Sequence, residues 1–294
     1  MLDDGAASRL TRLKARIHRL LSIVLPERVL DHYVMPVVER RAHRPYDAKR
    51  FFDSYYRATG AAGLSDRTTI SPYTNRFEST FHYNSVENSI ILSLTGRALP
   101  DAPRVLDVGS GAGHWIDFYR EVLGASMVTS VDISPIDVRN LRTRYKSVKG
   151  VKVVEADVAQ DSFDLGARFD IVNAVGVLFH IVDDARWEQA LRNLRHHLAD
   201  DGLLVVGGQF GYITQNVQFH ETDDFSDFDE LRATRAPVVL VNKRIRSIRR
   251  WRSTAERVGL RIVSLQRTKH DRRIRTPENN VLVLQRSARV EGDA

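Results

Sequence analysis

The chain has 294 residues, of which 43% are hydrophobic and 28% charged, and these ordinary globular values exclude a fibrous or wholly disordered protein. The absence of cysteine excludes disulfides, thiolate metal sites and cysteine nucleophiles, and it fits a reducing, cytoplasmic location. The net charge of +7 is compatible with nucleic acid, an anionic membrane surface or an acidic substrate as partner, although solvated arginine-rich helices explain it equally well.

The first part of the chain, residues 1–79, is predicted to be a helical N-terminal extension or lid. Residues 7–25 repeat apolar side chains at helical spacing with arginines between them. Such a basic amphipathic helix can lie on an anionic membrane, and it can equally pack on its own domain or on a second subunit. No apolar run reaches the roughly 20 residues of a membrane span, and no signal peptide is expected.

The second part, residues 80–290, alternates short β-branched runs with helical segments and predicts an α/β domain with a mostly parallel sheet. A helix is expected from near Ser85 to before Pro100. A later helix begins after Ser247 and ends at Gly259, with the basic run at 243–252 on its solvent face. The expected strands cover residues 104–108, 127–133, 151–156, 169–175, 203–209, about 260–267 and 280–286.

A glycine-rich turn follows the first expected strand, and it carries the strongest functional signal. Asp107 precedes a turn that contains Gly109, Gly111 and Gly113 and leads into a helix. Glycines permit close approach of a ligand, and a helix N-terminus offers free N–H groups, so we expect a nucleotide-like ligand. The spacing departs from the dinucleotide fingerprint because His114 stands at its sixth position, and Asp107 would repel a pyrophosphate. A cationic ligand is therefore favoured over NAD.

Two further acids end the next two strands. Asp132 closes the second strand, where a carboxylate can accept hydrogen bonds from ribose hydroxyls, and Asp157 follows the third. Ligands of open α/β sheets bind outside the carboxyl ends of the strands. The three acids therefore predict one crevice.

From Ser85 to the final strand, the sequence resembles class I S-adenosylmethionine-dependent methyltransferases. The resemblance rests, in chain order, on DVGSGAG, VDIS, EADV, FDIVNAVGVLFHI and LADDGLLVVGG. It implies a Rossmann-like, seven-stranded, mostly parallel sheet with an antiparallel last strand, for which NNVLVLQR is the candidate. The implied cofactor is S-adenosyl-L-methionine.

The resemblance also implies roles for individual residues. Asp107 would bind the ammonium group of the methionine portion, directly or through water, and Asp132 would bind the ribose. The glycines that would shape the floor of the site are Gly109, Gly111 and Gly113. Side chains expected along the adenine are Ile133, Asp157 and Val158. Those expected beside the methionine portion and open to the acceptor are Asn173 and Ala174.

Acceptor residues are predicted from their position relative to these motifs. His180 is the candidate general base, because the loop after the fourth strand borders the methyl group in the resembling family. Other candidate acceptor-binding residues are His82, Tyr83, Glu87 and, in an acceptor insertion near 209–240, His220. Each histidine can instead be a surface or packing residue. The paired acids Asp183–Asp184 and Asp223–Asp224 raise the question of magnesium, but they are also ordinary loop residues, and no metal site is predicted.

The expected reaction is O-methylation of a hydroxyl on a small molecule or glycan, with N- or C-methylation of a metabolite as the alternative. NAVG stands where proline-containing signatures of DNA or glutamine amino-group methylation would lie, so those classes are disfavoured. An RNA-binding methyltransferase or RNA-binding module remains a rival because of the arginines at 249–252 and 272–275. Peripheral membrane contact through 7–25 also remains open.

Overall fold

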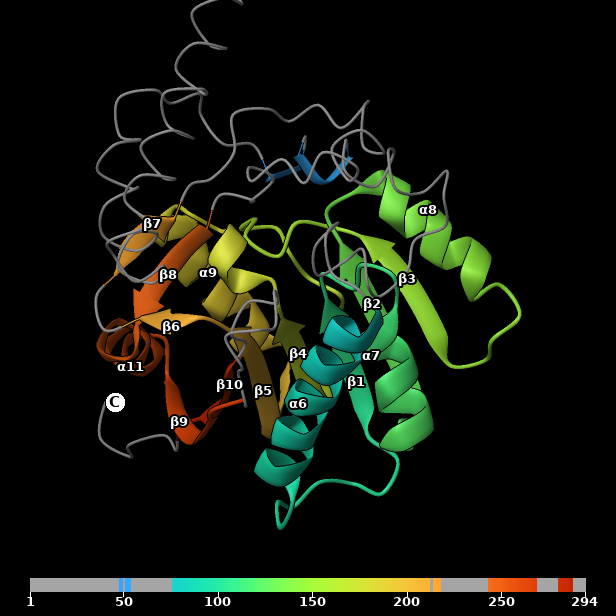
Figure 1. Ribbon diagram of the computed structural model, residues 1–294, viewed down its shortest axis with the longest axis horizontal. Coiled ribbons are helices and arrows are strands. Elements are labelled where there is room, and N and C mark those ends of the chain that lie inside the picture. The colour runs from blue at the N-terminus through green and yellow to red at the C-terminus, as the bar shows by residue number, and fades with distance from the viewer. Residues whose placement is uncertain are drawn as a thin grey trace, which may run out of the picture.

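The computed structural model describes residues 48–49, 51–53, 76–211, 214–217, 243–268 and 280–287 (Figure 1). Its centre is a seven-stranded sheet in which β1 to β5 run parallel and β10 is antiparallel to both of its neighbours. Across the sheet the strands are β3 (Val151–Glu155), β2 (Met127–Asp132), β1 (Arg104–Val108), β4 (Phe169–Val175), β5 (Leu198–Gly208), β10 (Asn280–Arg286) and β9 (Leu260–Gln266). This arrangement confirms the Rossmann-like prediction, including the antiparallel last strand.

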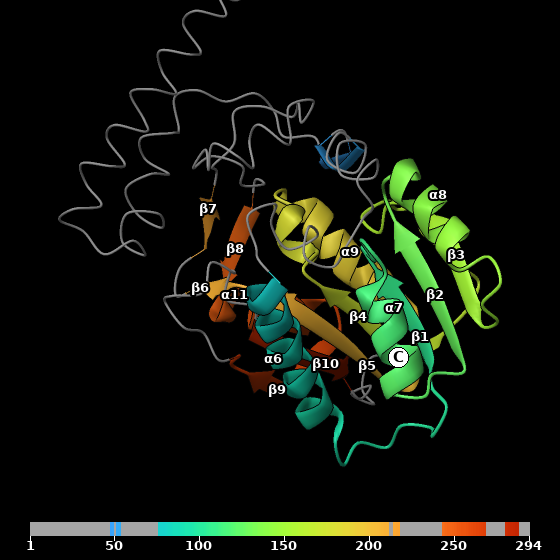
Figure 2. The ribbon, with the colours of Figure 1, turned by 45° about the vertical axis from the view of Figure 1, so that its right-hand side comes forward.

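Helices pack on both faces of the sheet, as Figure 2 shows. The helices are α6 (Arg76–Leu94), α7 (His114–Asp117) with a π-helical continuation (Phe118–Val122), α8 (Pro135–Arg144), α9 (Asp184–His196) and α11 (Ile248–Arg257). Apolar residues of α6, α7 and α8 form the core on one face, and those of α9 and α11 form the core on the other. The sheet is therefore the middle of three layers.

Strand β5 shows why these residues form a central strand. Leu203 and Val205 point into one core, whereas Leu204 and Val206 point into the other. Successive side chains of a strand alternate between its faces, so a continuous apolar run suits a sheet that is buried on both sides.

Two local expectations were wrong. Helix α6 begins at Arg76 instead of near Ser85, with Glu78 in its first turn, where a carboxylate stabilises the helix N-terminus. The boundary predicted between residues 79 and 80 falls inside this helix. The run KRIRS is not helical: it forms β8 (Lys243–Ser247), the middle strand of a small second sheet with β6 (Phe210–Gly211) and β7 (Gln215–Val217).

The expected helix after Ser247 is confirmed. Ser247 caps α11 by accepting a hydrogen bond from the Arg250 N–H group, and the Arg249 and Arg252 side chains are exposed. Residues 7–25, 220, 223–224, 272–275 and most of the insertion at 209–240 lie outside the described residues. In the part that the structure describes, no helix is both long and apolar enough to cross a bilayer.

Candidate functional site

The glycine turn lies at the carboxyl end of β1, and its backbone requires glycine. Gly109, Gly111 and Gly113 have φ angles of 69°, 52° and 95°, in the left-handed region that other residues avoid. A Cβ atom at Gly113 would also collide with the Tyr145 hydroxyl. A side chain at Gly109 or Gly113 would therefore be strained and would meet the side chain of Val177 or Tyr145.

Asp107, just before this turn, is fully buried and only partly hydrogen-bonded. Its Oδ1 atom accepts a hydrogen bond from Asn173 Nδ2 at 2.7 Å, and the Tyr119 hydroxyl donates to Asn173 Oδ1 at 3.1 Å. Asp107 Oδ2 has no hydrogen-bond partner among the described residues. Burial raises the pKa of Asp107 to about 6. A buried carboxyl with one unused oxygen is suited to bind a cationic group.

The sequence predicted that Asn173 and Ala174 open onto the acceptor, but the structure places both side chains in the interior. Both are fully buried in β4, and the Asn173 amide is used on both sides, by Asp107 and by Tyr119. In this structure Asn173 orients Asp107.

Asp132 ends β2, the strand next to β1. Its Oδ1 atom accepts a hydrogen bond from the Ser134 N–H group at 2.9 Å, and burial raises its pKa to about 6. Ser134 in turn is the N-cap residue of α8. The helix start therefore holds the carboxyl at the strand end.

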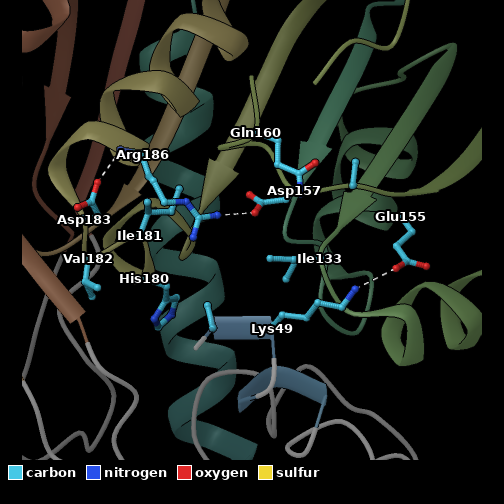
Figure 3. A pocket seen from close by; sticks show the side chains of 12 residues that line it. Lys49, Ile133, Glu155, Asp157, Gln160, His180, Ile181, Val182, Asp183 and Arg186 are labelled. Carbon is cyan, nitrogen blue, oxygen red and sulfur yellow. Dashed lines mark hydrogen bonds and ion pairs between the residues drawn. The ribbon is translucent and has the colours of Figure 1, made fainter. Parts of the chain in front are cut away.

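A cavity of about 740 Å³ lies beside these strand ends (Figure 3). Asp157 lies in its wall: its Oδ1 atom accepts from the Ala159 N–H group at 2.9 Å, and its Oδ2 atom accepts from Arg186 Nη2 at 2.5 Å. Elsewhere in the lining, Lys49 Nζ lies 3.3 Å from Glu155 Oε1 (Figure 3). The lining comprises Ala48, Lys49, Ile133, Glu155, Ala156, Asp157, Gln160, His180, Ile181, Val182, Asp183 and Arg186.

The cavity brings together four residues singled out in the sequence, namely Ile133, Asp157, His180 and Asp183. Val158 is buried beside it in the core. His180 ends a short 3-10 segment (Leu178–His180), and its ring lies 5.2 Å from that of Phe52 and 4.3 Å from that of Phe179. Two aromatic rings thus fix the position of the imidazole in the wall.

The remaining candidates from α6 gather at the glycine turn and not in this cavity. The His114 ring stacks on Tyr83 with 3.7 Å between centroids, and His114 Nε2 donates to Glu87 Oε1 at 2.7 Å. His82 is buried and meets the edge of Tyr83. Together these contacts fasten α6 to the start of α7.

Sequence reasoning missed four polar side chains of the lining, namely Lys49, Glu155, Gln160 and Arg186. Arg186 lies in the first turn of α9, and an arginine at the start of a helix has no distinctive spacing. Lys49 reaches the cavity from a segment far away in the sequence. The wall of the cavity therefore depends on tertiary contacts.

Asp183 and Asp184, the acid pair after β4, both accept hydrogen bonds from other residues of the protein. Asp183 caps α9 by accepting from the Arg186 N–H group at 2.8 Å. Asp184 accepts from Arg244 at 2.7 and 2.8 Å and from Arg246 at 3.0 Å, and the Arg244 hydrogen bonds hold its pKa down at about 2. Among the described residues, no group of three or more metal-binding side chains occurs.

The basic sequence of β8 suggested a solvent-exposed segment, but the Arg246 side chain of this strand is buried. This side chain is 1% exposed and its guanidinium lies 4.2 Å from the centre of the Trp187 ring. The Asp184 carboxylate and the Ile181 carbonyl accept its N–H groups. A buried arginine is tolerated because these partners replace water.

Comparisons with known proteins agree with this geometry. Residues 105–202 match the family model of a methyltransferase domain. Over 115 residues the chain is 28% identical to nodulation protein S of Bradyrhizobium diazoefficiens, which covers 39% of this chain and 53% of that protein. The chain spans about half the length, or less, of the curated relatives that it matches.

Two solved structures share the fold. One is the N-methyltransferase NodS of Bradyrhizobium japonicum in complex with S-adenosyl-L-homocysteine, with 16% identity and a TM-score of 0.53 over 80% of this chain and 100% of that one. The other is the magnesium protoporphyrin IX methyltransferase of Synechocystis with the same ligand, with 17% identity and a TM-score of 0.54 over 81% and 100%. The domain match and the shared fold agree with the resemblance to class I S-adenosylmethionine-dependent methyltransferases that the sequence motifs indicated.

Proposed function

We propose that the chain binds S-adenosylmethionine across the carboxyl ends of β1, β2 and β3 and transfers its methyl group to an acceptor. The observation that carries this proposal is the buried Asp107 carboxyl at the glycine turn, one oxygen of which has no hydrogen-bond partner among the described residues. An ammonium group supplies both the hydrogen bond and the positive charge that this oxygen lacks. The methionine end of the cofactor carries such a group.

The other contacts proposed for the cofactor follow the strand ends. Asp132 accepts hydrogen bonds from the ribose, Ile133 and Val158 pack beside the adenine, and Asp157 faces its amino edge. A cavity of about 740 Å³ fits this part of the ligand, because pockets for small ligands usually have about 300–1,000 Å³. The Arg186 guanidinium fixes the Asp157 carboxylate in that wall.

The cofactor, when bound, supplies an electrophilic methyl group on a sulfonium. The protein then has to hold an acceptor atom in line with that group, and positioning of this kind accounts for much of the rate. We propose a hydroxyl on a small molecule or glycan as acceptor and His180 as the base that takes its proton. On α6, His82, Tyr83 and Glu87 are proposed to border the acceptor. His220, which lies outside the described residues, is proposed as a further acceptor-binding residue.

N-methylation is the second candidate reaction. It is favoured by one finding: the NodS protein of Bradyrhizobium japonicum, whose solved structure shares this fold, is described as an N-methyltransferase. A neutral amine acceptor needs no general base before methyl transfer. The two reactions therefore predict different effects of removing the His180 imidazole.

The cofactor site is tested by Asp132→Ala, with Asp101→Ala as the matched control, because Asp101 is exposed before β1. Isothermal titration with S-adenosylhomocysteine should show about 10- to 100-fold weaker binding for Asp132→Ala, as expected for lost hydrogen bonds to a charged group. The control should bind like the wild type. Equal affinity of both variants would remove Asp132 from the site.

The base is tested by His180→Ala, once an acceptor has been found by labelled methyl transfer. Turnover of a hydroxyl acceptor should fall by about 10²- to 10⁴-fold, the range that general-base catalysis contributes, while cofactor affinity stays within about threefold. A fall in cofactor affinity with unchanged turnover would mean that His180 lines the nucleoside site and does not act as the base.

A further inference from the structure

Three aspartates contact Ser134 at the start of α8, two through their carboxyl groups and one through its backbone N–H group. The Ser134 N–H group donates to Asp132 Oδ1 at 2.9 Å, and the Ser134 hydroxyl donates to Asp53 Oδ1 at 2.6 Å. The same hydroxyl oxygen accepts from the Asp137 N–H group at 3.4 Å. Ser134 therefore has a clear role as a helix cap, but the Asp137 side chain has none.

The sequence S-P-I-D would suggest a different role for Asp137. In a capping box, the acid three residues after the cap accepts a hydrogen bond from the N–H group of the cap residue. Here Asp132 takes that N–H group, so the Asp137 carboxyl is excluded from the box. Asp137 is fully buried, and neither of its oxygens accepts a hydrogen bond from the described residues.

The chemical surroundings of Asp137 are acidic. The Asp132 carboxyl lies within hydrogen-bonding reach of it, and the negative charge of Asp107 acts on it as well. No cation is among the groups that influence it in the described part of the chain. Two carboxylates are both acceptors and repel each other, so a contact between them is stable only when one carries a proton.

We propose that Asp137 is protonated in the folded protein and donates a hydrogen bond to Asp132, which makes Asp137 a positioning residue for the ribose-binding carboxylate. The proton explains why one Asp137 oxygen lacks a donor, because that oxygen is itself the donor, and it leaves the other as an uncharged carbonyl oxygen. Burial and the neighbouring Asp132 raise the pKa of Asp137 to about 10. The consequence for ribose binding rests on the proposed function, whereas the protonation itself does not.

The arrangement gives Asp132 a fixed orientation. It accepts from the Ser134 N–H group, from the backbone of Gly111 and from Asp137. These bonds come from α8 and from the glycine turn, so the carboxylate is held from two elements of the site. A carboxylate has about four positions for hydrogen bonds, which leaves room for a ribose hydroxyl.

Infrared spectroscopy of the cofactor-free protein tests the proton directly. At pH 8, Asp107 and Asp132 are ionised, since burial raises the pKa of each only to about 6. The wild type should then show a carboxylic-acid C=O band that disappears in Asp137→Asn. Unfolding of the wild type should also release about one proton more than unfolding of Asp137→Asn, seen as a steeper loss of stability with rising pH. A band and a slope that are the same in both proteins would overturn the proposal.

The positioning role is tested by titration with S-adenosylhomocysteine. Asp137→Asn keeps a donor of the same shape and should bind within about threefold of the wild type, whereas Asp137→Ala should bind about tenfold more weakly. Wild-type affinity in a folded Asp137→Ala variant would overturn the positioning role. If the wild type itself does not bind the ligand, the proposed function fails, and the infrared result still decides the protonation.

Discussion

Replacement of Asp107 by asparagine should make the cofactor-free protein more stable and, at the same time, weaken cofactor binding. Asparagine has the same shape, and its Oδ1 atom can still accept the 2.7 Å hydrogen bond from Asn173 Nδ2. The change removes the negative charge of a fully buried carboxylate, one oxygen of which has no partner in the part of the chain that the structure describes. The structure therefore contains a carboxylate whose burial is unfavourable until a cation binds.

The size and sign of the effect follow from the Asp107 pKa. Burial raises this pKa from 3.8 in the unfolded chain to about 6, which corresponds to about 3 kcal/mol of unfavourable free energy when the group is ionised. Because the folded-state pKa is raised, the stability contributed by protonated Asp107 is fully present below about pH 4. It is lost as the pH rises through about 6.

The assay is thermal unfolding of both proteins between pH 4 and pH 8, with and without S-adenosylhomocysteine. At pH 7 and above, Asp107→Asn should melt several degrees higher than the wild type, since 1 kcal/mol shifts the midpoint of a protein of this size by about 2 °C. At pH 4 the midpoints should converge. Added ligand should raise the wild-type midpoint more than that of the variant.

Two results would refute this reasoning. If Asp107→Asn melts below the wild type at every pH, the buried carboxylate stabilises the cofactor-free fold, and its burial is not unfavourable in the absence of a cation. If the ligand raises both midpoints equally, Asp107 does not contact the cofactor.

The remaining predictions concern backbone strain and a buried histidine. Gly113→Ala should lower both stability and cofactor affinity, because a Cβ atom at φ 95° is strained and collides with the Tyr145 hydroxyl; a free-energy loss below about 1 kcal/mol in chemical unfolding would contradict this. His197 is fully buried, its Nε2 atom accepts from the Leu165 N–H group at 3.0 Å and its Nδ1 atom donates to the Asn193 carbonyl at 2.7 Å. His197→Phe should therefore cost about 2 kcal/mol in the same measurement, and unchanged stability would show that water replaces both partners.

Much of the fold was predictable because the strands have strong local signals. Strands β1, β4 and β10 lie at the residues that their β-branched patterns predicted, and Ser247 and Gly259 bound α11 as expected. The prediction for KRIRS was wrong because its basic residues imply exposure, whereas Arg246 is buried by partners more than 50 residues away in the sequence. No local pattern could indicate those partners.

The candidate site was predictable to a similar extent. The acids at the strand ends follow from the alternation of strands and helices, since parallel strands end at one edge of the sheet. The contacts of these acids do not follow from it. Asn173 was expected to open onto an acceptor, but it is buried against Asp107, and the Arg186 partner of Asp157 had no sequence signal. Pairings of this kind depend on which helices pack beside each strand end.

The central claim is that this site binds S-adenosylmethionine, and isothermal titration of the wild-type chain tests it most directly. S-adenosylmethionine and S-adenosylhomocysteine should each bind at one site per chain, and NAD should not bind, since Asp107 opposes a pyrophosphate at the glycine turn. Binding of NAD alone to the folded protein would contradict the account.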